Sequence, residues 1–378
     1  MRKTGLLKPV RGHSPVTWKF VALLVIRWGF IGSALGQTGP VEDLNALPVP
    51  ELYQRACAAC HGPDGRGYPG GEWRERTGLL TPPPDFTDPK FNSREPLEDW
   101  VAVIRDGGPA RGLSPQMPSF GLALTEAKIR ALARYLKGLG HDARYPPGEL
   151  NFYRGHRTTK AFPEDEFLLI SNYERLRSGG TVFQETLYYA HRIGPRYQWE
   201  IKGTPTFATG EDISGEVELG LKWAVAYDLA RRWILTVGLE PAFPVRSDEK
   251  WSATLYSTFG KALGDRWTLQ SSLHLKWSPP EGAEGWTLRW SGVVHGVFTS
   301  ARRGLFPALE WTVERGLSAG ARTRVWLLPQ VYAALSRRGH VALSVGPEIP
   351  LRRDPDVRFR IRAFLLWDYA DGPFWTGW

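Results

Sequence analysis

The chain has 378 residues, a mean hydropathy of −0.31 and a formal net charge of +9 at pH 7. Its length allows two or three domains, and its hydropathy excludes a bundle of membrane-spanning helices. The charge does not indicate a nucleic-acid partner, because the first 36 residues hold six basic residues and no acid, and the charge falls to +3 without them.

Residues 1–36 have the pattern of a secretory signal peptide. A long basic segment precedes the apolar run 20–26, and the small residues 33–36 follow it. Arg27 ends the apolar run early, so the run is too short for a stop-transfer helix, and an N-terminal membrane anchor is the alternative. Export would bring the chain into an oxidising compartment. Residues 37–45 are then expected to form an N-terminal linker.

The motif Cys57-Ala58-Ala59-Cys60-His61 predicts one covalently attached haem c. In this arrangement the two thiols form thioethers to the haem, and the neighbouring imidazole binds the iron. Zinc would need four nitrogen or sulfur ligands, and these are the only two cysteines of the chain. A thioredoxin-like site would need a βαβ context, and a disulfide across two residues would close almost no loop.

The second axial ligand of the iron is expected to be Met117. Methionine is the usual sixth ligand in electron-transfer cytochromes, where it raises the reduction potential. Of the two methionines, Met1 is the initiator, which leaves Met117, 56 residues beyond His61. The predicted cofactor site is therefore Cys57, Cys60, His61 and Met117, with His61 and Met117 as the metal ligands. Two filled axial positions leave no open site for a substrate, so we expect no enzyme.

Residues 46–140 resemble a class I cytochrome c of the single-haem bacterial type. The matching motifs are Cys57-x-x-Cys60-His61-Gly62, Asp64-Gly65-x-Gly67, Asp106-Gly107-Gly108 and Met117-Pro118-Ser119-Phe120. The resemblance implies a small all-α domain. The sequence agrees, with a short helix before Cys57, an apolar stripe of helical period over residues 96–105, and a last helix capped by Thr125.

Residues 141–166 have the composition of a polar linker and contain three prolines. His141 and His156 lie in this segment. We expect both side chains to face solvent, and a second metal site is the alternative.

From residue 167 to 378 apolar and polar residues alternate, which predicts β-strands with two different faces. Twelve strands are expected, at 167–176, 181–192, 196–204, 216–228, 233–243, 251–261, 266–277, 286–299, 305–314, 322–334, 340–349 and 356–369. Their length, the aromatic residues at their ends and the total of 17 tryptophans favour an antiparallel transmembrane β-barrel over a soluble sandwich or lipocalin-like barrel. Pro307, Pro329 and Pro347 fall inside strands and are expected to mark bulges.

The lumen of such a barrel would be narrow and charged. Twelve tilted strands give a diameter of about 24 Å, whereas a domain of this size is about 25–30 Å across, so we expect the cytochrome at the periplasmic mouth. Acids and bases on the predicted inner face are similar in number, which fits an open pore or a closed lumen. The acids are Glu216, Glu218, Asp228, Glu240, Glu310, Glu314, Glu348 and Asp368, and the bases are Lys222, Lys276, Arg289, Arg324, Arg358, Arg360 and Arg362.

The order of the two parts resembles the cytochrome–porin fusions that move electrons across the outer membrane, including those of iron-oxidising bacteria. This resemblance implies a multidomain protein of the outer membrane that transfers electrons at or across that membrane, with its cytochrome in the periplasm. The implied partners are periplasmic redox proteins and a small redox solute or an extracellular donor or acceptor. The alternative is a transport or scaffold barrel that carries the cytochrome as a tethered periplasmic relay or redox gate.

Overall fold

The computed structural model describes residues 43–279, 285–297, 304–351 and 354–377. The predicted signal peptide, most of the predicted N-terminal linker and the end of the eighth predicted strand lie outside the described residues. The described part of the chain contains no helix long and apolar enough to cross a membrane.

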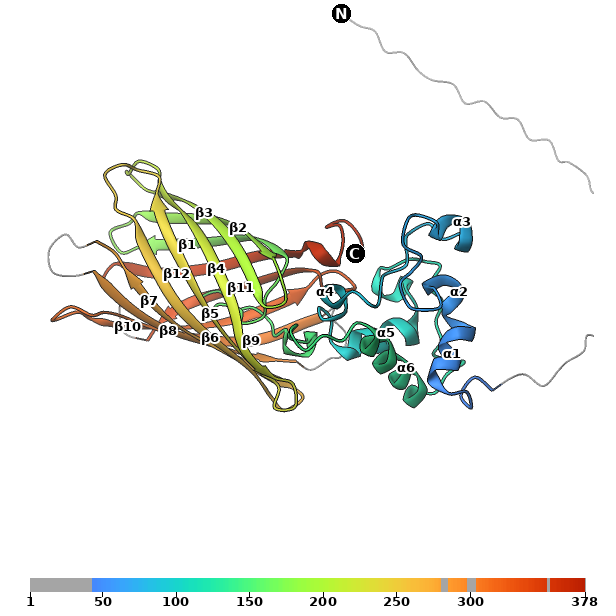
Figure 1. The fold of residues 1–378 in the computed structure, drawn as a ribbon. Coiled ribbons are helices and arrows are strands. Elements are labelled where there is room, and N and C mark those ends of the chain that lie inside the picture. The colour runs from blue at the N-terminus through green and yellow to red at the C-terminus, as the bar shows by residue number, and fades with distance from the viewer. Residues whose placement is uncertain (1–42, 280–284, 298–303, 352–353, 378) are drawn as a thin grey trace, which may run out of the picture. The chain divides into compact units, whose positions relative to one another are not determined.

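The first part of the described chain is helical (Figure 1). Its three longer helices are α1 (Val49–Ala56), α5 (Leu97–Asp106) and α6 (Glu126–Leu139), and its short ones are α2 (Ala58–His61), α3 (Trp73–Thr77), α4 (Pro89–Asn92), η1 (Pro109–Arg111) and η2 (Gly148–Leu150). The hydroxyl of Thr125 accepts a hydrogen bond from the backbone N–H of Lys128 (3.3 Å), which satisfies one of the free N–H groups at the start of α6. The apolar faces of α1, α5 and α6 meet in one buried core.

Twelve antiparallel strands close into a barrel (Figure 1), which confirms the architecture predicted from the alternating pattern. The strands are β1 (Glu166–Leu176), β2 (Thr181–Arg192), β3 (Tyr197–Ala208), β4 (Ser214–Asp228), β5 (Trp233–Pro244), β6 (Ser252–Leu263), β7 (Trp267–Trp277), β8 (Trp286–Gly296), β9 (Gly304–Gly316), β10 (Thr323–Ala334), β11 (Val341–Pro350) and β12 (Val357–Asp368). Each pairs with its neighbours in sequence, and β1 pairs with β12. Closure leaves no strand edge unpaired.

The outward face of the barrel is apolar. Leu187 and Leu221 are both 52% exposed, although they occupy the middle of long strands. Aromatic rings pair near both ends of the barrel wall, for example Trp251 with Trp277 (ring centroids 4.9 Å apart) and Tyr197 with Trp223 (6.1 Å). An exposed apolar band between two sets of aromatic residues is what a membrane-spanning barrel presents to lipid.

The three strand prolines do not produce the bulges that the sequence predicts. Pro307 pairs in register with Val331. Pairing between β10 and β11 is interrupted around Pro329 and Pro347, because both strands lack an N–H donor at the same level. The pairing then resumes in the same register. The register shifts lie elsewhere, next to Arg175 in β1 and next to Ala224 in β4.

Residues 150–165, which we call the plug segment, lie inside the barrel rather than in a simple linker. Their hydrogen bonds reach β2, β3, β5, β7, β9 and β11, so the segment crosses the lumen from wall to wall. His156, predicted to face solvent, instead bonds to Ser344 of β11 through its Nε2 (3.1 Å) and lies against the ring of Phe364 (4.7 Å). His141, outside the plug segment, is exposed as predicted.

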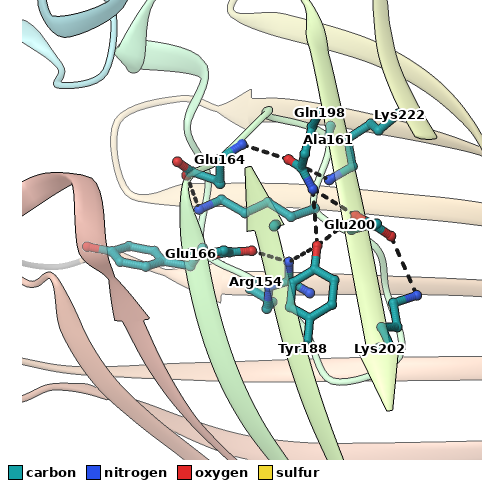
Figure 2. Close-up of polar contacts among 12 residues, drawn as sticks. Arg154, Ala161, Glu164, Glu166, Tyr188, Gln198, Glu200, Lys202 and Lys222 are labelled. Carbon is teal, nitrogen blue, oxygen red and sulfur yellow. Dashed lines mark hydrogen bonds and ion pairs between the residues drawn. The ribbon is translucent and has the colours of Figure 1, made fainter. Parts of the chain in front are cut away.

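Wall side chains supply the hydrogen bonds that the backbone of the plug segment needs. The carboxylate of Glu310 accepts from the N–H groups of His156, Arg157 and Thr158 (2.8, 2.8 and 2.6 Å) and from the Thr158 hydroxyl (2.7 Å). The side-chain oxygen of Gln198 accepts from the N–H of Glu164 (2.7 Å), within the polar network of Figure 2. A buried N–H without a partner would cost about 1–3 kcal/mol.

Two apolar clusters hold the plug segment on either side of these polar contacts. The ring of Tyr153 packs against Phe306 and Tyr332 of the wall (centroids 4.7 and 4.9 Å). A second cluster buries Phe152 and Phe162 of the segment among residues of β4, β5 and β6. Both ends of the segment are therefore fixed by apolar packing as well as by hydrogen bonds.

We expect the full-length protein to show few or no channel openings in planar lipid bilayers. Glu310→Ala removes the acceptor of three N–H groups inside the barrel, one of them buried and two half-buried, which should loosen the plug segment and produce openings in single-channel recordings. Glu249→Ala, in the exposed turn between β5 and β6, is the matched control and should remain closed. A steady large conductance of the unmodified protein would contradict a closed lumen.

Candidate functional site

Two hydrogen bonds to backbone carbonyls hold the turn from Cys57 to His61. Cys57 ends α1, and Gly62, with φ +77°, ends α2 directly after His61. The buried hydroxyl of Tyr53 donates to the carbonyl of Gly62 (2.6 Å), and the N–H of Gly67 donates to the carbonyl of His61 (2.9 Å). These bonds fix where the two thiols and the imidazole point.

The His61 ring is partly buried and electrically neutral. It stacks on Phe86 (centroids 4.8 Å apart), and burial lowers its pKa to about 4, which keeps the form that can bind a metal. Its Nδ1 is buried without a hydrogen-bond partner in the described part of the chain. Burial, and then the neighbouring Cys60, raise the pKa of the Cys57 thiol to about 11.

Met117 lies in a loop that folds back on the end of α5. The N–H of Gly108 donates to the carbonyl of Met117 (3.0 Å). A Cβ on Gly107 would come within 3.0 Å of the Ser119 nitrogen, and one on Gly108 within 2.2 Å of the Ser114 carbonyl oxygen. The two glycines therefore allow the close approach that sets the position of Met117.

A second close approach shapes the opposite side of the site. Gly67 adopts φ +68°, and a Cβ there would lie 2.6 Å from the carbonyl oxygen of Pro83. This contact brings the proline-rich segment, and with it Phe86, against the Cys57-to-His61 turn. Only glycine tolerates both this φ angle and this contact, which explains why the motif has glycine at position 67.

These features fit a covalently bound haem. Two thiols two residues apart, a neutral imidazole with a free nitrogen and a glycine-dependent loop carrying a thioether are the donor set that such a group needs. Apolar residues of the core, Phe86, Trp100 and Ile104 among them, supply a dry wall. Cys57 and Cys60 would hold haem covalently, and His61 and Met117 would bind its iron.

Sequence reasoning missed two supporting side chains of this site. Tyr53 is fully buried and bonds to the end of the haem motif, and Phe86 stacks on His61. Phe86 follows three consecutive prolines, which mark an extended segment but not its destination. Tyr53 comes one turn before Cys57 on α1, and that spacing places it on the same helix face as the motif.

The lumen holds a second candidate site, on the side of the plug segment where β1 ends and β2 begins, which we call the loop side. A cavity of about 440 Å³ is bounded there by plug residues and by charged side chains of the wall. Plug residues Arg157, Thr158 and Thr159 form one boundary, and Arg289 of β8 and Arg362 of β12 line the sides. We call this cavity the chamber. The alternating sequence pattern marks the wall residues of the chamber as inward-facing, but it does not show that plug residues bound the chamber.

Residues 45–136 match the family model described as Cytochrome C oxidase, cbb3-type, subunit III. No curated relative matches the chain in sequence.

Similar solved structures include the KdgM porin in complex with disordered oligogalacturonate (7% identity, 54% of this chain and 99% of that one, TM-score 0.40). The NanC porin (10%, 53% and 98%, 0.41) and an outer membrane channel from Pseudomonas putida F1 (10%, 57% and 99%, 0.42) are further examples.

The chain therefore combines a cytochrome c domain with a β-barrel of the outer-membrane type. The first class rests on the family match and on the Cys-x-x-Cys spacing, which is consistent with one covalent haem c. The second rests on closure of the twelve strands and on their apolar outward face. Residues 45–136 match the cytochrome model, and residues 166–368 form the closed barrel.

Replacing both thiols, by Cys57→Ser with Cys60→Ser, is expected to abolish covalent haem, because no thioether can form. Each single variant should keep one bond and a reduced yield. Haem staining of a denaturing gel measures this. Ala59→Ser, at the exposed position between the cysteines, is the control and should stain normally. Stain that persists in the double variant would contradict the assignment.

Met117→Ala is expected to lower the reduction potential by on the order of 100 mV, because axial ligands set haem potentials over a wide range. The iron should also become open to added imidazole, which a visible-absorbance titration detects. Pro115→Ala changes an exposed neighbour in the same loop and should leave both properties unchanged. An unchanged potential in Met117→Ala would show that another group is the ligand.

Proposed function

We propose that this protein is a single-haem electron carrier held at the outer membrane by its own closed barrel. Outer-membrane barrels place both chain ends and their short turns in the periplasm. The cytochrome precedes β1, and β12 ends at the same side as β1 begins, since Glu166 pairs with Asp368. This topology supports a periplasmic cytochrome.

The observation that carries the proposal is the continuity of the plug segment with the cytochrome. The carboxylate of Glu149 accepts from the N–H of Leu97 at the start of α5 (3.0 Å) and pairs with Lys137 of α6 (3.5 Å). The next residue, Leu150, is fully buried in the apolar cluster of the plug segment. No free linker separates the two, so the haem domain is tethered directly to the segment that crosses the lumen.

A crossed lumen favours electron exchange at the periplasmic mouth over delivery of a redox solute through the barrel. Haem supplies reversible one-electron exchange when it is bound. The chain would contribute the thiols of Cys57 and Cys60 to retain it, His61 and Met117 to bind its iron, and an apolar wall to exclude water. Its partners would then be periplasmic redox proteins or small redox solutes of that compartment.

A transport barrel with the cytochrome as a redox gate is the second candidate. The charged chamber on the loop side of the plug segment favours it, because a purely structural barrel has no need for such a cavity. Under this function the plug segment would move when the haem changes its oxidation state.

The test uses the full-length haem-loaded protein in liposomes, oriented with the haem side inside together with a reductant. We expect haem absorbance to stay reduced when an impermeant acceptor is added outside, and to become oxidised when the same acceptor is enclosed on the haem side. Retention of a fluorescent dye enclosed in the same liposomes corrects for leakage.

Reoxidation by the outside impermeant acceptor would overturn the proposal, since it would demonstrate electron transfer across the membrane by this chain alone. Solute flux that appears only in one oxidation state of the haem would support the redox gate instead.

A further inference from the structure

The plug segment forms one boundary of the chamber, which we call its floor, and the strands form its wall. At about 440 Å³ it lies within the size range of small-molecule sites. The plug side chains that line it are Arg154, whose charge is paired with Glu166, and His156, Arg157, Thr158 and Thr159, none of which is a carboxylate. The floor of the chamber is therefore suited to a negatively charged group.

Positive charge is in excess beside this floor. The single carboxylate of Glu348 is shared by three guanidinium groups, those of Arg157 (3.1 Å), Arg360 (2.9 Å) and Arg362 (2.7 Å). Arg360 has a second partner in Glu174. One guanidinium charge in this group is thus not balanced by a carboxylate, and it lies where water is scarce, since Arg362 is only 6% exposed.

Arg289 adds a further positive charge to the chamber. Among the described residues its hydrogen bond runs from Nη2 to the Nδ1 of His274 (3.1 Å), a neutral acceptor, and its Nε is buried without a partner. Glu314 lies opposite Arg289 in the strand register, yet no ion pair joins the two within the described part of the chain. Arg289 therefore keeps donors for a ligand.

The carboxylates that line the chamber belong to the wall: Glu216, Glu218 and Glu240 on β4 and β5, Glu174 on β1 and Glu314 on β9. Lys202 of β3 is surrounded by Glu200, Glu218 and Glu240 at 3.5, 3.3 and 2.9 Å. Its ammonium already occupies the centre of that acidic group, the place that a cation would take. Surplus acid on β3 to β5 and surplus base on β8, β12 and the plug segment create a field across the chamber that pulls an anion towards the floor.

We propose that the chamber binds a small anion that carries carboxylate or phosphate groups, between Arg157 of the plug segment and Arg289 of β8. Guanidinium groups bind both kinds of anion through paired, charge-assisted hydrogen bonds. Arg362 strengthens the site by its charge, and the Thr158 and Thr159 side chains line the same floor. This inference goes beyond the proposed function and does not depend on the haem.

Isothermal titration of the full-length haem-loaded protein in detergent micelles tests the site. Citrate and inorganic phosphate are titrated separately, which distinguishes the carboxylate from the phosphate source, and the diamine putrescine serves as the cationic probe. We expect at least one of the two anions to bind and putrescine not to bind.

Arg157→Gln and Arg289→Gln should each weaken anion binding about tenfold or more, because each removes a charged donor pair. Arg322→Gln removes the same charge from an exposed position just before β10, outside the chamber, and should change the affinity by less than about twofold. Unchanged haem absorbance and heat-modifiable gel mobility establish that each variant is folded. If Arg157→Gln fails to fold, Arg289→Gln on the barrel wall decides the question.

Equal affinity in all three variants, no binding of either anion at millimolar concentration, or binding of putrescine that Glu216→Gln abolishes would each overturn the proposal. Any of these outcomes would leave the electron-carrier assignment standing, because the liposome assay measures the haem and not the chamber.

Discussion

A peptide segment can occupy the lumen of a barrel only if the wall satisfies its backbone hydrogen bonds, and the structure of this protein depends on that constraint. One carboxylate, Glu310, takes three consecutive N–H groups and a hydroxyl, while Gln270 and Gln198 take the N–H groups of Ala161 and Glu164. Each bond left unmade would cost about 1–3 kcal/mol. Because they are made, the segment that follows the cytochrome is held within the barrel.

The position of the plug segment bears on both proposals, the electron carrier and the anion site. It ties the haem domain to the barrel, since Glu149 bonds to the start of α5 while Leu150 is buried within the barrel. It also divides the lumen and leaves a charged chamber on the loop side. An electron carrier at the periplasmic mouth and an anion site in the chamber are therefore two consequences of the same inserted segment.

Structural features that depend on one short stretch of sequence were predicted correctly. Alternation of apolar and polar residues indicated every strand, because one face meets lipid and the other the lumen. Strand prolines misled the prediction. A single proline suggests a bulge, but Pro329 and Pro347 lie opposite each other, so the ladder simply opens there and continues in register.

The sequence by itself determined the haem motif, the methionine at a suitable distance, the glycine motifs of a cytochrome and the twelve-stranded barrel. Each is encoded by residues close together in the chain or by a regular period. Only the tertiary structure decided where residues 150–165 lie. His156 and Glu310 are 154 positions apart and belong to no repeating pattern. A polar segment made to bond to a wall has the same composition as a solvated linker, and the difference appears only when the barrel closes around it.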